Sequence, residues 1–433
     1  MRTRLLLVTA LLLALPAANP SGPAAQAQTA NCSIAGQNRY VRDVLFEFYY
    51  WYRELPNINP AAFPSPQAYL EAVRYRPLDS TYSYIANRAE QEAFFSSSQF
   101  VGLGMSTQFN GVTMRVSQVF PESPAAEAGL ARGDRILSIG GRMVDVLFAG
   151  GELDRAFGPN EEGVAVDLRW QTVAGEERSG TLVKRAVTIP TVSATRLYDV
   201  DGRKVGYIMF RNFVEPSFGA LDAAFAQLKE AGATELVLDL RYNGGGLVTV
   251  AQHLASLIGG TRTVDRTFAE FFHNDRHPDL NRTLAFEPKE HALDLQRLVV
   301  ITTRASASAS ELVINALRPF IPVVIVGDTT FGKPVGQYGF TFCDKVVNPV
   351  SFILRNANGE ADFFNGFEPD CRAADDLDHE LGDPAEASLG EAFTVLRTGS
   401  CTPGPEGETA RARALRDRPI MLGDGWQQLL GAH

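Results

Sequence analysis

The chain has 433 residues, enough for about two to four domains, and 45% of them are hydrophobic and 10% aromatic, as in a globular protein with a buried core. Its 50 acidic and 40 basic residues give a net charge of −10, which argues against a nucleic-acid-binding surface and against a polybasic membrane patch.

The first 27 residues have the features of a secretory signal. Two arginines precede an apolar run from Leu5 to Leu15, which is shorter than the roughly 20 residues that cross a bilayer. Small residues at Ala25 and Ala27 form a cleavage site. We therefore expect a signal over 1–27 and a secreted or periplasmic protein. A retained N-terminal anchor is the alternative, and a lipid anchor at Cys32 is not expected because the preceding Thr-Ala-Asn does not match a lipobox.

The cysteine count favours two disulfides in an exported protein. Of the three connectivities, we favour the pair Cys343–Cys371, which flanks one compact segment, together with Cys32–Cys401. Neither a CxxC nor an HExxH motif occurs, and the six histidines show no ligand spacing. No metal site and no cofactor are expected.

Residues 32–95 predict a small helical N-terminal region. Apolar side chains recur at helical spacing and Pro-interrupted aromatic stretches follow them. We interpret this aromatic stripe as core rather than as a ligand site; its first members are Val41, Val44, Leu45, Phe48, Tyr49 and Tyr52.

Residues 96–188 change to short alternating runs separated by Gly, Pro and Asp turns, which is typical of a small antiparallel sheet or barrel. A short helix is expected within SPAAEAGLARGD at 123–134. This stretch resembles a PDZ domain of the bacterial protease type through its GLGM loop and SPAAEAGLARGDRILSI. The resemblance implies that the loop binds a peptide C-terminus and that the peptide adds a strand to the sheet edge; the loop residues are Gly102, Leu103, Gly104 and Met105.

From 189 to 400 strands alternate with helices, which favours a mostly parallel sheet with both faces covered. Strands are expected at 204–212, 235–240, 297–304 and 323–328, with a helix at 309–318 between the last two. A right-handed crossover makes those two strands parallel, so their carboxyl ends lie at one sheet edge. The fold class is therefore mixed α/β, with a largely parallel catalytic core, a PDZ-like barrel and the helical region; residues 401–433 are expected to form a tail.

Three segments place candidate catalytic groups at that edge. They are the serines of SASASE at 306–311, Lys333, and the glycines of RYNGGG at 241–246. A serine hydroxyl needs a base to become a nucleophile, and lysine is such a base if burial lowers its pKa. Backbone N–H groups at a glycine loop and a helix start can hold an oxyanion. Each segment also has a structural interpretation: a Ser308–Glu311 capping box, a solvated lysine and a tight turn. The chain has only six lysines, so a lysine at 333 is not the default cation.

SASASE, FGKPVGQ and DLRYNGGG, in this order relative to the PDZ-like segment, resemble the C-terminal processing peptidases, serine endopeptidases with a Ser/Lys dyad. The resemblance covers roughly residues 96–400. It implies that Ser308 is the nucleophile, Lys333 the general base and Gln337 a supporting residue. It also implies an oxyanion hole from Ala309 and one glycine of 244–246, with Gly244 and Gly245 the candidates.

The expected function is that of an exported serine endopeptidase. Its substrates would be unfolded or C-terminally exposed proteins, and no nucleic acid partner is expected. The sequence leaves open whether the protein forms a homo-oligomer or binds an adaptor protein. A catalytically silent PDZ scaffold is the alternative. A copy that had lost its activity should also have lost Ser308, Lys333 or Gln337, and all three are present. A Ser-His-Asp hydrolase lacks support because no GxSxG motif occurs.

Overall fold

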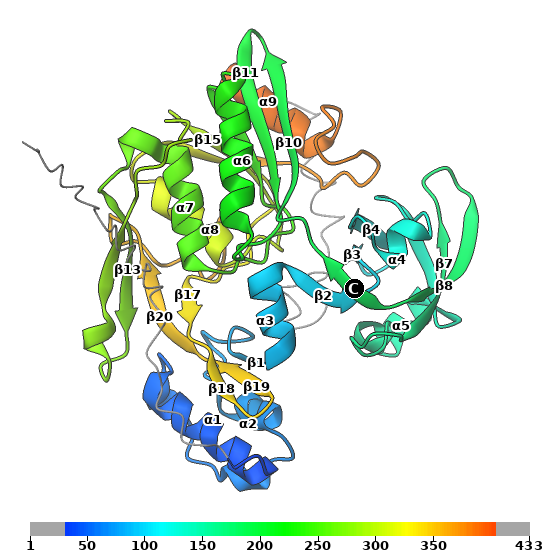
Figure 1. The fold of residues 1–433 in the computed structure, drawn as a ribbon, viewed down its shortest axis with the longest axis vertical. Coiled ribbons are helices and arrows are strands. Elements are labelled where there is room, and N and C mark those ends of the chain that lie inside the picture. The colour runs from blue at the N-terminus through cyan, green and yellow to red at the C-terminus, as the bar shows by residue number, and fades with distance from the viewer. Residues whose placement is uncertain (1–30, 404–433) are drawn as a thin grey trace, which may run out of the picture.

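The computed structural model describes residues 31–403, so the expected signal at 1–27 and the tail from 404 onward lie outside the described residues. Figure 1 shows a blue helical region, a cyan-to-teal barrel beside it, and a larger body that runs from green to orange. The predicted mixed α/β class with a PDZ-like barrel is confirmed. Within residues 31–403, no helix is both long and apolar enough to cross a membrane.

The helical region consists of α1 (Ile34–Phe48), α2 (Pro66–Val73) and α3 (Arg88–Ser97), with the strand β1 (Tyr84–Asn87) between the last two. Helix α1 begins where the Ser33 hydroxyl accepts the Gly36 N–H at 3.2 Å, which satisfies one of the unpaired amides of the first turn. Its apolar face packs on α2 and on buried side chains of the strands that follow Lys333. The helical region therefore shares a hydrophobic cluster with the strands that follow Lys333.

The helical region is connected to the barrel by a two-stranded antiparallel pair, β2 (Gln99–Gly102) and β9 (Arg185–Thr188). The barrel sheet has the order β3-β4-β5-β7-β8, and all its pairs are antiparallel. Alternate residues of its strands fill a separate apolar core, together with the short helices α4 (Pro124–Glu127) and α5 (Val144–Ala149). The barrel strands are β3 (Met105–Phe109), β4 (Met114–Val119), β5 (Arg135–Ile139), β7 (Ala165–Gln171) and β8 (Glu177–Val183), and β6 (Arg142–Met143) pairs with β5.

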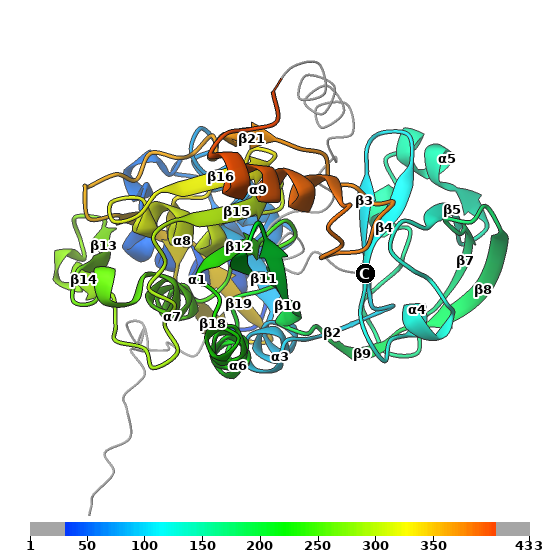
Figure 2. The same cartoon turned by 90° about the horizontal axis from the view of Figure 1, so that it is seen from above.

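The core sheet has the order β10-β11-β12-β15-β16-β21, and every pair except β10–β11 is parallel. Its side chains alternate between two faces: Leu236 and Leu238 face one apolar cluster and Val237 faces the other. Helices α6 (Ser217–Glu230), α7 (Val248–Gly259) and α8 (Ala309–Leu317) cover the first face and α9 (Ala387–Thr398) covers the second, as Figure 2 shows. The core strands are β10 (Val192–Val200), β11 (Arg203–Phe210), β12 (Glu235–Asp239), β15 (Leu298–Thr302), β16 (Val323–Gly327) and β21 (Cys371–Arg372).

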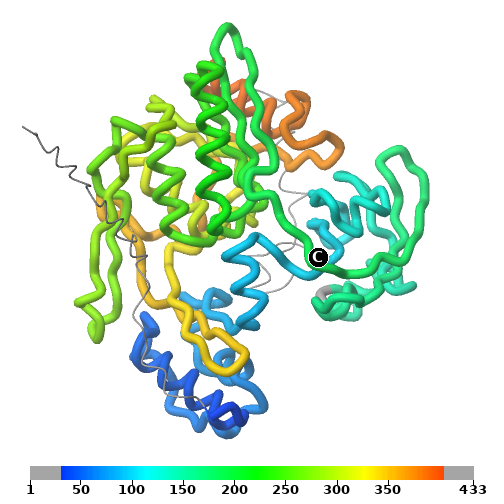
Figure 3. Tube along the Cα trace, in the orientation of Figure 1, coloured from blue at the N-terminus to red at the C-terminus, as the bar shows by residue number. Residues whose placement is uncertain are grey.

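A second sheet, in the order β14-β13-β20-β17, flanks the core, and a three-stranded sheet, β1-β19-β18, joins the core to the helical region. In Figure 3 the yellow-to-gold tube of β17 to β20 runs down from the core to the blue helical region. The segment after Lys333 is therefore shared by both parts. These strands are β13 (Thr267–His273), β14 (Arg282–Ala285), β17 (Val335–Gln337), β18 (Phe340–Phe342), β19 (Lys345–Asn348) and β20 (Val350–Arg355).

Two disulfides form, as the cysteine count predicts, but the predicted connectivity is wrong. Cys32 pairs with Cys343, and Cys371 pairs with Cys401. Cys343 lies at the tip of the β18–β19 hairpin, which projects to the helical region, whereas Cys371 lies on β21 in the core sheet. The two cysteines flank a segment that is short in sequence but whose ends belong to different sheets.

Candidate active site

Ser308 occupies the sharp turn between β15 and α8, where it is the N-cap residue. Its φ of 56° and ψ of −110° are a backbone conformation that costs a non-glycine residue about 1–3 kcal/mol and that clusters at functional sites. Ala307 and Ala309 are buried, whereas Ser308 is half-buried and lines a cavity of about 420 Å³. Of the three serines, only Ser308 lines this cavity.

The neighbouring serines anchor this turn to the glycine loop after β12. The Ser306 hydroxyl donates to the Leu240 carbonyl at 2.7 Å, and the Ser310 hydroxyl donates to the Asn243 carbonyl at 2.9 Å. Both side chains are fully buried. Their alternation with alanine therefore places two hydroxyls into the core and one toward the cavity.

Lys333 comes from the loop after β16 and lines the same cavity as Ser308. Only 8% of it is exposed, and its Nζ donates to Gln337 Oε1 at 2.6 Å. Burial lowers the pKa of Lys333 to about 8, against the opposing effects of the Asp79 and Glu311 carboxylates. About half of the molecules therefore hold a neutral Lys333 at pH 8, the form that a general base requires.

Glu311 is the carboxylate that joins the two candidate residues. It is fully buried, and its Oε2 accepts the backbone N–H of Ser308 at 2.9 Å and that of Lys333 at 2.8 Å. Its Oε1 accepts the Gly332 N–H and the Thr330 hydroxyl, both at 2.6 Å. The predicted capping box with Ser308 is present. The bonds to the lysine loop were not predicted, because they join segments that only the fold brings together.

The glycine loop fits closely under the Ser308 turn. Gly245 has a φ of +100°, and a Cβ added there would lie 2.8 Å from the Ala307 carbonyl and 2.8 Å from the Ser308 Cβ. The Gly245 N–H donates to Asn243 Oδ1 at 2.9 Å. Only glycine therefore fits at 245, and its own amide is already engaged.

Two other amides of this region remain free. Within residues 31–403, neither the Ala309 N–H nor the Gly246 N–H has a hydrogen-bond acceptor. Both residues line the cavity beside Ser308, whereas Gly244 and Gly245 do not. Among the glycines considered from the sequence, Gly246 is thus the one that borders the cavity.

The rest of the cavity lining contains apolar side chains, mostly from α7, α8 and the flanking sheet, and polar side chains from β1, α3 and β19. The apolar side chains are those of Leu247, Val248, Leu312, Val335, Phe352, Leu354 and Phe363. The polar side chains are those of Tyr84, Gln91, Glu92 and Asn348. Helix α3, which leads into the barrel, therefore borders the cavity.

The PDZ-like barrel contacts the core through a buried charge network. Arg132 of the barrel donates to Asp375 Oδ1 at 3.0 Å and to the Tyr242 hydroxyl at 2.5 Å. Arg241, which is fully buried, pairs with Asp239, Glu386 and the same Asp375. Since Tyr242 lies two residues before Gly244, its hydrogen bond with Arg132 links the barrel to the start of the glycine loop.

The predicted peptide-binding loop lies at the start of the barrel and not at the Ser308 cavity. All of its four residues, Gly102, Leu103, Gly104 and Met105, are buried. The Leu103 carbonyl accepts the Ala125 N–H at 2.8 Å, and the Gly104 carbonyl accepts the Phe120 N–H at 2.9 Å.

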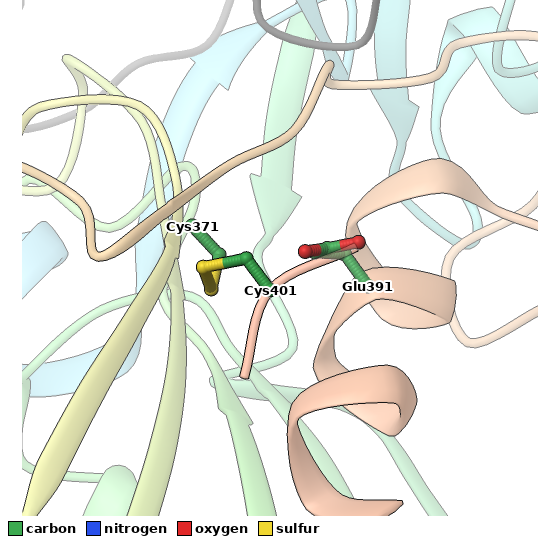
Figure 4. A group of neighbouring side chains, drawn as sticks. All are labelled: Cys371, Glu391 and Cys401. Carbon is green, nitrogen blue, oxygen red and sulfur yellow. A yellow bond between two sulfur atoms is a disulfide. The ribbon is translucent and has the colours of Figure 1, made fainter. Parts of the chain in front are cut away.

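One group of potential metal ligands occurs within residues 31–403: Cys371, Glu391 and Cys401, whose ligand atoms lie within 4.8 Å of one another. Figure 4 shows that the two sulfur atoms are bonded to each other. The Glu391 carboxylate accepts the N–H of Thr402 at 2.8 Å. In this state the sulfurs form a disulfide and offer no thiolate to a metal.

The chain combines a PDZ-like barrel with an α/β core that carries a serine on a strained strand-to-helix turn. The model of peptidase family S41 matches residues 204–373, that of the S41 N-terminal domain matches 36–84, and that of the PDZ domain matches 115–150. The chain thus matches peptidase family S41 over most of its core and over part of its helical region.

Relatives and solved structures agree with this family. The carboxyl-terminal-processing protease of Synechocystis sp. is 30% identical over 56% of this chain and 55% of that protein. The carboxy-terminal processing protease CtpB of Bacillus subtilis is 29% identical over 60% and 52%. The chain thus spans about half the length of these curated relatives. The crystal structure of a protein assigned as an S41 protease, from Bacteroides fragilis, superposes with a TM-score of 0.67 at 25% identity, over 83% of this chain and 97% of that one.

Proposed function

We propose that this protein is an exported serine endopeptidase in which Ser308 is the nucleophile and Lys333 the general base. One observation carries the proposal. Ser308 and Lys333 come from separate loops, line one cavity, and have their backbone amides bound by the same carboxylate oxygen, that of Glu311.

In the proposed reaction, neutral Lys333 takes the proton of the Ser308 hydroxyl as Oγ adds to the scissile carbonyl. The free N–H groups of Ala309 and Gly246 hold the resulting oxyanion, each donor contributing about 2.7–4 kcal/mol. The Lys333 ammonium then protonates the leaving amine, and an acyl-enzyme remains on Ser308. Lys333 then deprotonates a water as its oxygen adds to the acyl carbonyl, the Ser308 Oγ–acyl bond breaks, and the Lys333 ammonium returns the proton to Oγ. Gln337 orients the lysine through its 2.6 Å hydrogen bond.

The proposed substrates are unfolded or C-terminally exposed polypeptides. The apolar cavity wall suits an apolar side chain next to the scissile bond, and the Gly102–Met105 loop is proposed to hold the substrate C-terminus. The relatives named as carboxyl-terminal processing proteases support this substrate class. Two disulfides support an oxidising, exported environment.

The test is hydrolysis of casein by residues 28–433, beside Ser308→Ala and Lys333→Ala, with a metal chelator present. We expect cleavage by the wild type and none by either variant, with the fold of both intact by circular dichroism. Cleavage that survives Ser308→Ala would assign the nucleophile elsewhere. No cleavage by wild-type protein, together with binding of apolar C-terminal peptides, would favour the silent scaffold instead.

A further inference from the structure

Besides β1 and α3, which line the cavity, one turn of the helical region, residues 79–83, contacts the loop that carries Lys333. Asp79 at the start of this turn is fully buried. Its Oδ1 accepts the N–H groups of Tyr82 and Ser83, both at 2.9 Å. Its Oδ2 accepts the Tyr49 hydroxyl at 2.9 Å and the Ser83 hydroxyl at 2.6 Å. Four donors thus converge on one carboxylate, and together they fix the path of the chain into β1.

Tyr82, held by Asp79, contacts the lysine loop at two points. Its hydroxyl donates to the carbonyl of Gly332, the residue before Lys333. Its own carbonyl accepts the Gln337 Nε2 at 2.5 Å, and the Asn348 carbonyl accepts the same amide at 3.0 Å. Because the amide nitrogen of Gln337 faces two carbonyls, its oxygen is left to face Lys333 Nζ.

The carboxylates that act on the pKa of Lys333 lie on two separate elements. Glu311 lies on α8 and Asp79 lies on the turn of the helical region, and both carboxylates raise the pKa of Lys333 against the larger effect of burial. Arg304, in the loop before α8, donates to the Thr330 carbonyl at 2.9 Å and lowers the pKa of Tyr82. Asp79 is the charge in this set that the catalytic core does not supply.

We propose that Asp79 is a positioning residue for the general base: through Tyr82 it orients Gln337 on Lys333, and the helical region thereby forms a working part of the peptidase site. This inference rests on the proposed function of Lys333. It assigns a role in the reaction to a region that none of the catalytic motifs includes.

The variant Asp79→Asn tests it, because the amide keeps the size of the side chain and removes its charge. Two readouts are needed: the pH profile of kcat/KM for casein cleavage, and titration of Lys333 by NMR with ¹³Cε-labelled lysine. The chain has six lysines, and Lys333→Met assigns the resonance. Asn38→Ala is the matched control, since Asn38 is a buried side chain of the same region that binds only the carbonyls of Pro60 and Phe63.

In Asp79→Asn we expect the Lys333 titration and the acid limb of kcat/KM to move down together by ~0.5–1 pH unit. We also expect the high-pH rate to fall about 10-fold as Gln337 loosens. Asn38→Ala should lower thermal stability without moving either midpoint. Midpoints and rate in Asp79→Asn that equal those of the wild type would overturn the inference.

The two readouts separate the inference from the proposed function. If wild-type protein cleaves nothing and Lys333 still shifts in Asp79→Asn, the proposed function fails while the control of Lys333 by Asp79 stands. If Asp79→Asn does not fold, Tyr82→Phe is used instead, because it removes only the bond from the Tyr82 hydroxyl to the Gly332 carbonyl. A loss of kcat of about 10-fold at unchanged KM is then expected, and wild-type kinetics in Tyr82→Phe would also overturn the inference.

Discussion

Lys333 serves the proposed chemistry at a cost in stability. Its pKa is about 8 in the folded protein against 10.5 for an ordinary lysine, so the unfolded chain binds more protons between these values. Stability therefore rises with pH from about 8 to 10.5, and the full penalty, about 3 kcal/mol, acts below pH 8.

Replacing this lysine should stabilise the protein as it abolishes cleavage. We expect Lys333→Met to raise the free energy of unfolding at pH 7 by about 2 kcal/mol, which is the charge penalty less about 1 kcal/mol for the lost bond to Gln337. The gain should shrink toward pH 10.5. Urea unfolding at several pH values measures it, with the exposed Lys204→Met as the control. A gain independent of pH would contradict the buried-charge argument.

Glu311 should matter more than a helix cap does. Glu311→Gln places an amide NH2 group against two donors, so the free energy of unfolding should fall by about 2–4 kcal/mol, whereas losing a cap costs about 1. Casein cleavage should fall about 100-fold, because Ser308 and Lys333 lose their common anchor. Glu177→Gln, at an exposed position of β8, is the control. Wild-type activity in Glu311→Gln would reduce its role to capping.

At the scale of elements, the interface between the barrel and the core contains charged side chains that are buried and ion-paired. Arg132 is 7% exposed and reaches Asp375 and Tyr242, and Gln108 of β3 also bonds Asp375. A buried pair of this kind stabilises little over an apolar contact, but breaking it is costly. The junction therefore fixes the orientation of the barrel against the loop that ends in Gly246.

The Arg132→Met variant tests this junction. It leaves Asp375 with one fewer cation, so we expect the free energy of unfolding to fall by about 3–5 kcal/mol and cleavage to fall with it. The control is Arg142→Met, a barrel arginine outside the junction whose pair with Glu152 is exposed and whose loss should change stability little. Equal effects of the two variants, measured by urea unfolding and casein hydrolysis, would show that the buried network adds nothing to the junction.

At the scale of the whole molecule, the two disulfides close loops of very different length. Cys32–Cys343 joins the start of the helical region to the hairpin after Gln337, across 311 positions, and Cys371–Cys401 spans only 30. A cross-link over the longer separation restricts the unfolded chain more.

Removing the longer link should therefore cost more stability. We expect Cys32→Ser/Cys343→Ser to lower the free energy of unfolding by about 4–5 kcal/mol, against about 3 for Cys371→Ser/Cys401→Ser. Thermal unfolding compares the two double variants. Peptide mapping without reductant checks the pairing first, and recovery of Cys343 joined to Cys371 would contradict this connectivity.

Much of the core could be predicted because its signals are local. The strand at 298–302, the helix at 309–317 and the strand at 323–327 follow from buried apolar runs, a capping box and short loops. The crossover rule then makes the two strands parallel, as observed. The convergence of Ser308, Lys333 and the glycine loop at one edge follows from that topology.

What the sequence by itself determined are most elements of the parallel core, the PDZ-like barrel and the three segments proposed to carry the chemistry, because each depends on periodicity or on residues close together in the chain. Only the tertiary structure decided the disulfide pairing, the bonds of Glu311 to the lysine loop and the approach of Asp79 and Tyr82 to Gln337. Those contacts join segments separated by up to hundreds of residues, and no local pattern records which distant backbone a buried polar group will meet.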